Sequence, residues 1–125
     1  MSETKLLPYT LWNVGDEEYK LKLNTATICK LENEFKTNLL NIIMGGNIPP
    51  LYIMMKVIHG AMLPYQHGIK ESDVFTIFDQ YCEEGGSQTS LLTDVFIPIY
   101  QVSGFFSRAQ AEELKEQMDE ARAQM

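Results

Sequence analysis

Residues 21–35 read LKLNTATICKLENEF, and within this stretch the spacing of the apolar side chains changes. Leu21 and Leu23 alternate with polar residues, which is typical of a β-strand. Beyond Asn24 and Thr25, either of which can cap a helix, apolar residues recur at spacings of three and four. This helical set is Ile28, Leu31, Phe35 and Leu39. The stretch therefore predicts a chain that passes from a strand into a helix.

Upstream of this change, residues 6–23 are predicted to form a β-hairpin. Apolar residues alternate with other residues on both sides of a polar turn at Gly15 and Asp16. The two alternating sets are Leu7, Tyr9 and Leu11, and then Tyr19, Leu21 and Leu23. Pro8 has no N–H to donate to a neighbouring strand, so the first strand is expected at a sheet edge.

Downstream, glycine and proline signals divide residues 24–125 into about five helices. One helix opens at Pro49 and Pro50, where a missing N–H costs nothing. The next, over residues 69–84, has apolar side chains on more than a narrow stripe and is expected to be the central helix. Pro98 lies inside the following helix and predicts a kink or a break there.

The last predicted helix, over residues 107–125, opens with a capping-box pattern at Ser107 and Gln110. Its apolar stripe is thin, so this helix is expected to serve as an arm or to fray. The stripe is Ala111, Leu114, Met118, Ala121 and Met125. The predicted fold class is mainly α, a compact bundle of about five helices with a short N-terminal β-hairpin. One domain is expected over residues 1–125, with its helical core at 24–106.

Residues 79–91, DQYCEEGGSQTSL, raise the question of an ion-binding loop. An EF-hand loop starting at Asp79 needs oxygen ligands at positions one, three and five, glycine at six and glutamate at twelve. The chain instead has Tyr81, Glu84 and Ser90 at positions three, six and twelve. The pattern therefore does not predict a calcium site.

The same residues do not match a phosphate loop either. They lack the lysine of GxxxxGK[ST] and the spacing of GxGxxG, and two glutamates precede the glycine pair. We interpret them as a corner between two helices. Gly85 is expected to take the left-handed conformation, and Ser87 is expected to cap the next helix.

The histidines and cysteines form no recognisable metal or catalytic motif. His59 and His67 lie eight residues apart, which is not a zinc spacing, and we interpret them as structural. Cys29 and Cys82 lie within helical patterns and are expected to pack as small apolar side chains, in a reducing compartment. No cofactor and no enzymatic activity are predicted, although an enzyme using either histidine as acid or base stays as a minority hypothesis.

Net charge is −7, and it is uneven along the chain. Residues 1–69 hold six lysines and six acids, whereas residues 70–125 hold four basic residues and eleven acids. An acidic half repels nucleic acid and anionic membranes, so neither is predicted as a partner. It suits a basic protein partner, or it serves solubility alone. No apolar run reaches the roughly 18 residues of a membrane span, and no secretory signal is recognised at the start.

Four methionines cluster in the second quarter of the chain: Met44, Met54, Met55 and Met62. Methionine fills irregular gaps in cores, and it also recurs on surfaces that accept varied apolar partners. Both interpretations stay open, and the second predicts an exposed groove for an apolar segment of another protein.

Four segments resemble a known family. They are KLNTATICKLENEF (22–35), NIPPLYIMMKVIHGAML (47–63), YQHGIKESDVFTIFDQYCEEGGS (65–87) and VFIPIYQVSGFF (95–106). Together they resemble the tail assembly chaperones of long-tailed bacteriophages, of the type found in phages and prophages of Gram-positive bacteria. The resemblance covers roughly residues 20 to 106 and includes no catalytic motif.

The resemblance implies a non-enzymatic protein of the host cell cytoplasm. It would bind the tape measure protein, keep it soluble, help tail tube protein polymerise around it, and be absent from the finished virion. Self-association and a longer product made by ribosomal frameshifting are further expectations. The methionine cluster, or Phe105 and Phe106, would supply the apolar partner surface. The alternative is a small acidic adaptor or inhibitor that binds a basic protein partner.

Overall fold

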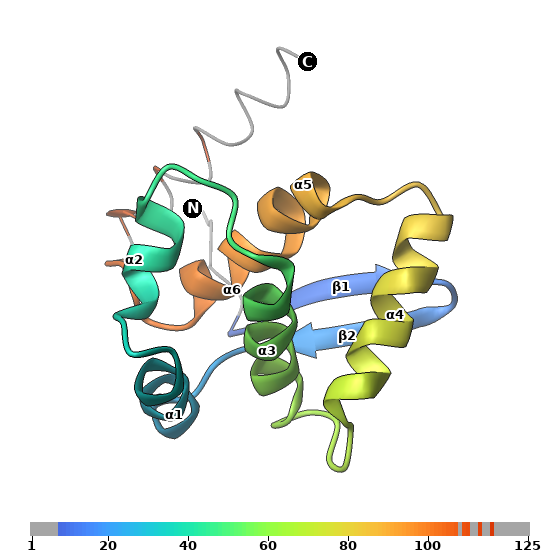
Figure 1. Ribbon diagram of the computed structural model, residues 1–125, viewed down its shortest axis with the longest axis horizontal. Helices are drawn as coiled ribbons and strands as arrows, with labels where there is room; N and C mark the ends of the chain where they lie inside the picture. The colour runs from blue at the N-terminus through green and yellow to red at the C-terminus, as the bar shows by residue number, and fades with distance from the viewer. Residues whose placement is uncertain (1–7, 108, 111–112, 114–115, 117–125) are drawn as a thin grey trace, which may run out of the picture.

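The computed structural model describes residues 8–107, 109, 110, 113 and 116, which are mainly helical with an N-terminal β-hairpin (Figure 1). The first elements are β1 (Thr10–Val14), β2 (Glu17–Leu21), α1 (Thr25–Phe35) and α2 (Leu39–Met44). They are followed by α3 (Leu51–Met62), α4 (Glu71–Glu83), α5 (Gln88–Leu91), the π-helical turn η1 (Leu92–Phe96) and α6 (Ile97–Val102). Because α5, η1 and α6 follow one another directly, residues 8–107 contain five helical segments, and the predicted fold class is confirmed.

The hairpin pairs β1 with β2 in antiparallel register, with Trp12 opposite Tyr19. Directly opposite side chains share one face of a sheet, so Trp12 and Tyr19 both belong to the inner face. Trp12 and Val14 are buried there, whereas Leu11 is only partly buried. The alternation predicted for the first strand placed Leu11 on the apolar face, so this prediction is wrong by one residue.

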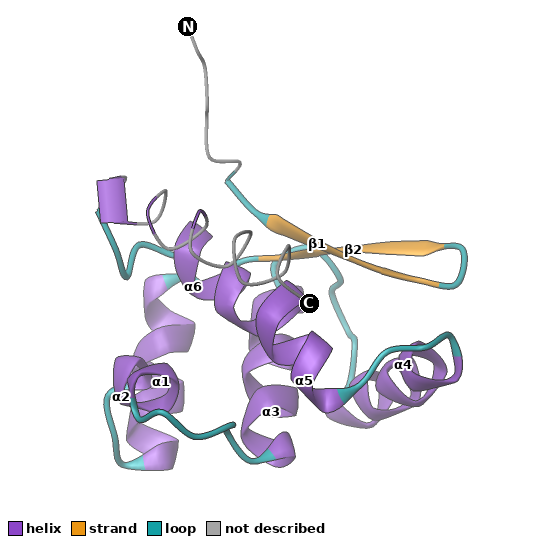
Figure 2. Cartoon of the chain, turned by 90° about the horizontal axis from the view of Figure 1, so that it is seen from above, coloured by secondary structure: helices purple, strands orange, loops and turns teal. Residues whose placement is uncertain are grey.

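Helix α3 is the centre of the structure. It contacts α1, α4, β2 and η1, and with α4 it covers one face of the hairpin (Figure 2). The backbone N–H of Lys22, just after β2, donates to the carbonyl of Ala61 on α3 at 3.0 Å. The expectation that the helix over residues 69–84 is central is wrong. That helix, α4, lies at the edge, buries only Val74 and Ile77, and leaves Phe75 47% exposed.

A break separates α1 from α2, although Leu39 fits the apolar spacing of α1. Lys36 adopts the left-handed conformation with φ 59°, which ends the helix. Asn38 then caps α2, since its side chain accepts a hydrogen bond from the Leu40 N–H at 2.9 Å. Asn24 caps α1 in the predicted way, accepting from the Thr27 N–H at 2.9 Å. The predicted single helical face is thus divided between two helices.

Pro98 does not break its helix. A proline ring crowds the carbonyl four residues earlier, which here belongs to η1. The helix widens at that point, and the Ile97 N–H bonds the carbonyl of Leu92 five residues back. Of the two predicted outcomes, a kink or a break, the break is absent, and the irregularity takes the form of a π-turn.

The corner predicted at residues 79–91 is confirmed. Gly85 has φ 103°, and the Ser87 hydroxyl accepts a hydrogen bond from the Ser90 N–H at 3.1 Å. The Ser90 hydroxyl in turn lies 2.6 Å from the Tyr81 hydroxyl, and this hydrogen bond links the corner to the end of α4. The sequence did not indicate this second link.

The capping box at residue 107 is also present. The Ser107 N–H donates to Gln110 Oε1 at 2.9 Å, and the Gln110 N–H donates to Ser107 Oγ at 3.2 Å. The apolar stripe predicted from Ala111 to Met125 falls on residues outside the described part of the chain.

Candidate functional site

An apolar groove runs between α3 and α4 and encloses about 300 Å³. It is lined by Leu51, Tyr52, Met55, Phe75, Phe78 and Asp79. We call it the α3–α4 groove. Five of its six residues are aliphatic, aromatic or thioether side chains, and the sixth is a carboxylate. Its chemistry suits an apolar segment with a polar group at one end.

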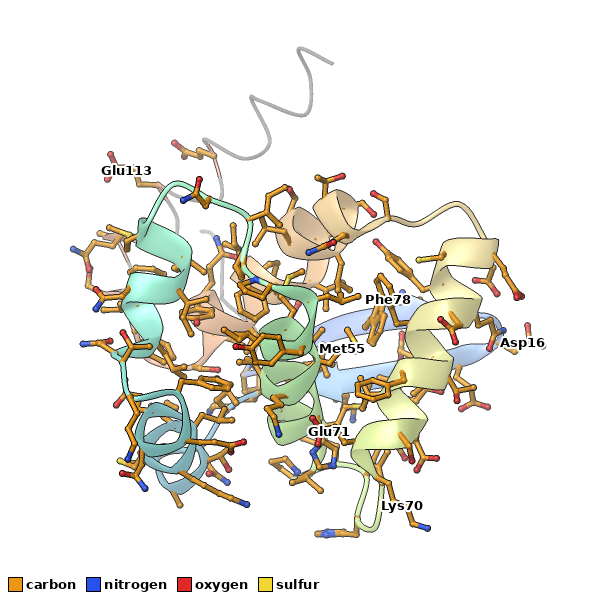
Figure 3. All side chains as sticks on the ribbon, in the orientation of Figure 1. Asp16, Met55, Lys70, Glu71, Phe78 and Glu113 are labelled. Atoms are coloured by element: carbon orange, nitrogen blue, oxygen red, sulfur yellow. The ribbon has the colours of Figure 1, made fainter. Side chains whose placement is uncertain are left out.

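Helical spacing brings these residues together. Residues three and four apart lie on one face of a helix, and the groove uses Leu51 and Met55 on α3, and Phe75, Phe78 and Asp79 on α4. Figure 3 shows Met55 and Phe78 in the space between the two helices. Both walls therefore come from regular, packed elements rather than from loops.

Burial differs between the floor and the rim of the groove. Met55 is 2% exposed and forms part of the floor, and Phe78 is partly buried against the core. Tyr52 is 61% exposed and Phe75 is 47% exposed, so these two rings stand at the rim. These two large aromatic side chains are exposed to water beside a flexible thioether. Covering them with an apolar partner is therefore energetically favourable.

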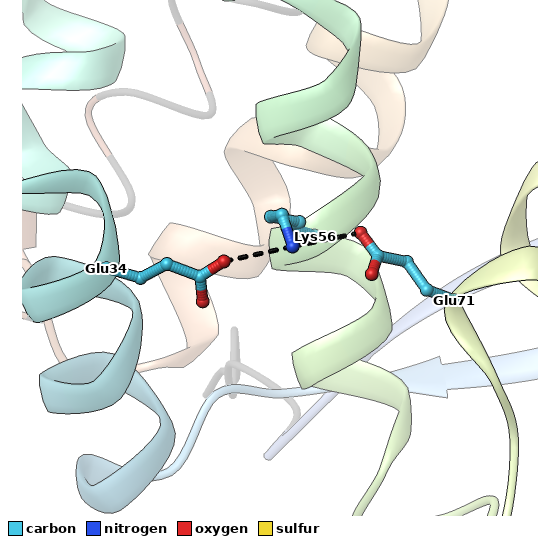
Figure 4. Close-up of polar contacts among 3 residues, drawn as sticks. All are labelled: Glu34, Lys56 and Glu71. Carbon is cyan, nitrogen blue, oxygen red and sulfur yellow. Dashed lines mark ion pairs between the residues drawn. The ribbon is translucent and has the colours of Figure 1, made fainter.

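One end of the groove is marked by an ion-pair network that joins three helices. Lys56 Nζ lies 2.9 Å from Glu34 Oε2 on α1 and 3.3 Å from Glu71 Oε2 on α4 (Figure 4). The hydrogen bond with Glu34, and then that with Glu71, raises the pKa of Lys56. Lys56 follows Met55 directly, and Glu71 precedes Phe75 by one turn. The network carries two acids and one base, so this end is net negative.

The other end of the groove holds Asp79. Its side chain is exposed and forms no ion pair with any residue in the described part of the chain. Both ends of the α3–α4 groove therefore carry negative charge, while its middle is apolar.

A sequence profile for a family of unknown function, DUF6096, matches residues 9–124. The chain belongs to this family. The matched region contains the hairpin, every helix from α1 to α6 and the whole α3–α4 groove. No curated protein and no solved structure matches the chain.

The structure places the predicted partner-binding residues of this DUF6096 protein in two environments. Met54, Met55 and Met62 are buried, because they face inward on the central helix α3. For these three the core-filling interpretation is confirmed, and that of an exposed methionine cluster is wrong. Met44, at the end of α2, is 72% exposed but does not line the groove. Of the four methionines, Met55 alone reaches the groove, as its floor.

Phe105 and Phe106, the other predicted partner-binding residues, are partly buried and pack against the core. The ring of Phe105 lies 4.7 Å from that of Tyr100, centroid to centroid. The rim residues Tyr52 and Phe75 were not predicted. Only the width of the apolar face on α4, which exceeds a narrow stripe, pointed toward Phe75.

The histidines and cysteines do not form a shared site. His59 Nε2 donates to the carbonyl of Ile69 at 2.9 Å, which confirms its structural interpretation. His67 lines a separate, open hollow of about 490 Å³ and mixed polarity, formed by Tyr19 of β2, residues 66–69 and α4. Cys29 and Cys82 are exposed, so the expectation that they pack as small apolar side chains is wrong. Within the described residues, no three His, Cys, Asp or Glu side chains are grouped to hold a metal ion.

Acidic side chains of the hairpin lie beside those of α4. The Gly15 N–H in the hairpin turn donates to Glu84 Oε1 at 3.0 Å, and Gln80 Nε2 donates to Glu84 Oε2 at 3.1 Å. The hydrogen bond from Gly15 places the neighbouring Asp16 close to the acidic end of α4, and Figure 3 shows Asp16 beside that helix. None of the helices in the described ranges has the length and apolar character to cross a membrane.

Proposed function

We propose that this protein is a non-enzymatic assembly chaperone of a long-tailed bacteriophage that binds the tape measure protein and promotes assembly of the tail tube. The α3–α4 groove, with exposed Tyr52 and Phe75 at its rim, is the observation that carries the proposal. Both walls of the groove lie in segments 47–63 and 65–87, which are two of those that resemble tail assembly chaperones.

The physical reasoning concerns a partner that is long, helical and apolar. Such a chain aggregates unless its apolar face is covered, and a groove between two helices is a common receptor for an amphipathic helix. Covering the Tyr52 and Phe75 rings contributes a favourable free energy of about 25 cal/mol for each Å² of apolar surface removed from water, from which the entropic cost of association is subtracted. The net charge of −7 keeps the complex soluble.

In this proposal the protein acts in the cytoplasm of the host cell and leaves before the virion is complete. Its partners are the tape measure protein and, during polymerisation, the tail tube protein. Self-association belongs to the same proposal.

The test is co-expression with a fragment of the tape measure protein encoded nearby, followed by affinity capture at low and high salt. We expect the fragment to become soluble and to be captured at both salt concentrations. The double variant Tyr52→Ala/Phe75→Ala is expected to weaken capture by about tenfold or more, as when aromatic anchors are removed from an interface. The matched control is Ile48→Ala, which removes a side chain with similar exposure, 48%, outside the groove.

Two outcomes contradict the proposal. One is a fragment whose solubility does not change when the wild-type protein is present. The other is equal loss of capture in the groove variant and in the Ile48→Ala control, because the groove would then have no particular role.

A second candidate, the acidic adaptor or inhibitor, is favoured by the acidic surface where the hairpin turn meets α4. Asp16 and Glu83 are both exposed there. In this function Asp16→Asn/Glu83→Gln weakens binding to a basic protein, and binding falls steeply with salt. In the chaperone function the same double variant captures the tape measure fragment as well as the wild type does.

A further inference from the structure

We infer that the α3–α4 groove selects an amphipathic helix that carries a lysine or arginine next to its apolar anchor residues, and that Asp79 is the group that pairs with this base. The inference rests on the proposed function, because it takes the groove to bind an apolar helical segment. It adds the chemical class of segment that the groove accepts.

The length of the groove determines how many apolar anchor residues of a partner helix it can hold. Leu51 to Met55 on one wall and Phe75 to Asp79 on the other each span a rise of about 6 Å, one turn of a helix. A partner helix therefore presents two large apolar side chains, three or four residues apart, to the floor at Met55. Its further anchors, at a spacing of seven, contact the exposed rings of the rim.

The charge at the two ends of the groove determines which residues can flank the apolar anchors of the partner helix. The one lysine of α3, Lys56, is already held by Glu34 and Glu71, so it offers no free positive charge to an acidic partner. Asp79 has no ion-pair partner among the described residues and lines the groove itself. An apolar helix without a base would cover this carboxylate with nothing to compensate for its lost hydration.

A basic residue in the partner helix would offset the lost hydration of Asp79 by pairing with its carboxylate. Lysine and arginine have long apolar stems that can lie along an apolar rim while the charged end reaches a carboxylate. A stem along Phe75 would bring its charge to Asp79, one turn further on α4. An acidic flank would instead meet negative charge at both ends of the groove. The arrangement thus discriminates between helices of equal hydrophobicity by the sign of their flanking charges.

The test uses two synthetic helical peptides of about 16 residues, long enough to form helix on binding. Both carry leucine at spacings of three, four and seven, and they differ only in having lysine or glutamate next to the leucines. Binding to the full chain is measured by fluorescence anisotropy at low and high salt. We expect the wild type to bind the lysine peptide more tightly, with the difference reduced at high salt.

Variants then assign the preference to Asp79. Asp79→Asn is expected to reduce the preference for the lysine peptide by about 1.4- to 5-fold, the range for exposed ion pairs. Asp79→Lys is expected to move the preference toward the glutamate peptide. The matched control is Glu18→Gln, which removes one exposed acid from β2, outside the groove, and is expected to leave the preference unchanged. Circular dichroism of each variant establishes that it is folded.

Failure of this inference is distinguishable from failure of the proposed function. Equal affinity for both peptides, or a preference unchanged by Asp79→Asn, overturns the inference while capture of the tape measure fragment still supports the chaperone function. Lack of binding by either peptide overturns it too. A lysine preference that depends on Asp79, in a protein that does not solubilise the fragment, supports the inference and contradicts the proposed partner.

Discussion

The Tyr100 hydroxyl donates a hydrogen bond of 2.8 Å to the carbonyl oxygen of Leu39, and so joins α6 to α2 inside the core. Both residues are fully buried. The contact links residues 61 positions apart, and it holds the short helix α2 in place beside the longer helices. Burial, and to a lesser degree the charge of Glu32, raises the pKa of Tyr100 well above its ordinary value.

Tyr100→Phe removes this bond and little else, so we expect it to lower the free energy of unfolding by about 1 kcal/mol near neutral pH. The sign of the pH effect follows from the raised pKa. The contribution of Tyr100 is fully present below the unfolded pKa of about 10 and is lost as pH rises further, because the unfolded state ionises first. Urea denaturation near neutral pH and at about pH 11 is the measurement.

The free energies of unfolding of wild type and Tyr100→Phe are expected to differ less at about pH 11 than near neutral pH. Only the wild type has this phenol, which the folded state keeps protonated while the unfolded state ionises it. Burial also raises the pKa of Tyr19 and Tyr81, and both are present in the two proteins, so their effects cancel in the comparison. A difference that stays constant over this range would contradict the account of Tyr100.

Gly60 sets how closely α1 approaches α3. A Cβ at this position would lie 2.7 Å from Thr27 Cγ2, which is closer than side-chain atoms pack. Gly60→Ala is therefore expected to lower the free energy of unfolding by about 1 to 3 kcal/mol, even though alanine favours helix more than glycine. Thr27→Ser removes the crowded methyl group. In a double-mutant cycle measured by urea denaturation, Gly60→Ala is expected to cost less in the Thr27→Ser background, and additive effects would contradict the steric explanation.

Local patterns in the sequence predicted the local features of this fold. The turn at Gly15, the cap at Asn24, the corner at Gly85 and the box at Ser107 all depend on residues within a few positions of each other. These features follow from side-chain geometry and from the conformational freedom of glycine, which do not depend on the rest of the molecule.

Features that depend on how helices face each other were not predictable in the same way. The apolar residues of α3 and α4 were recognised, but their spacing does not tell which helix lies at the centre. Met55 and Phe75 illustrate this, since one is buried and the other half exposed although both belong to apolar helical faces. The α3–α4 groove exists only because these two faces meet with their edges uncovered. The left-handed Lys36 likewise has no signal in its residue type.

Lys56 joins three helices, yet we expect it to contribute little to stability. Its two ion pairs, with Glu34 and Glu71, are partly exposed to water, and exposed pairs contribute less than about 1 kcal/mol. Lys56→Gln is expected to lower the free energy of unfolding by less than that amount, and high salt should reduce the difference further. Denaturation at low and high salt tests this. A loss of several kcal/mol that salt does not change would instead indicate a buried structural role.

Gly86 lies under the ring of Tyr81, and this contact gives a prediction with an optical readout. A Cβ at Gly86 would fall inside the space of that ring, so Gly86→Ala is expected to displace Tyr81 and to weaken its 2.6 Å hydrogen bond with Ser90. Tyr81 also packs against Trp12 at 5.5 Å between ring centroids. Trp12 is the only tryptophan in the chain, so its emission reports this contact specifically.

We expect the emission of Trp12 to change in folded Gly86→Ala, together with a loss of about 1 to 3 kcal/mol in the free energy of unfolding. Gly85→Ala is the informative comparison. Its φ of 103° strains any side chain, but a Cβ there meets no atom within 4 Å. It should therefore destabilise the corner while leaving the native emission of Trp12 close to that of the wild type. The same change in emission for both variants would show that the effect at Gly86 is general strain in the corner rather than displacement of Tyr81.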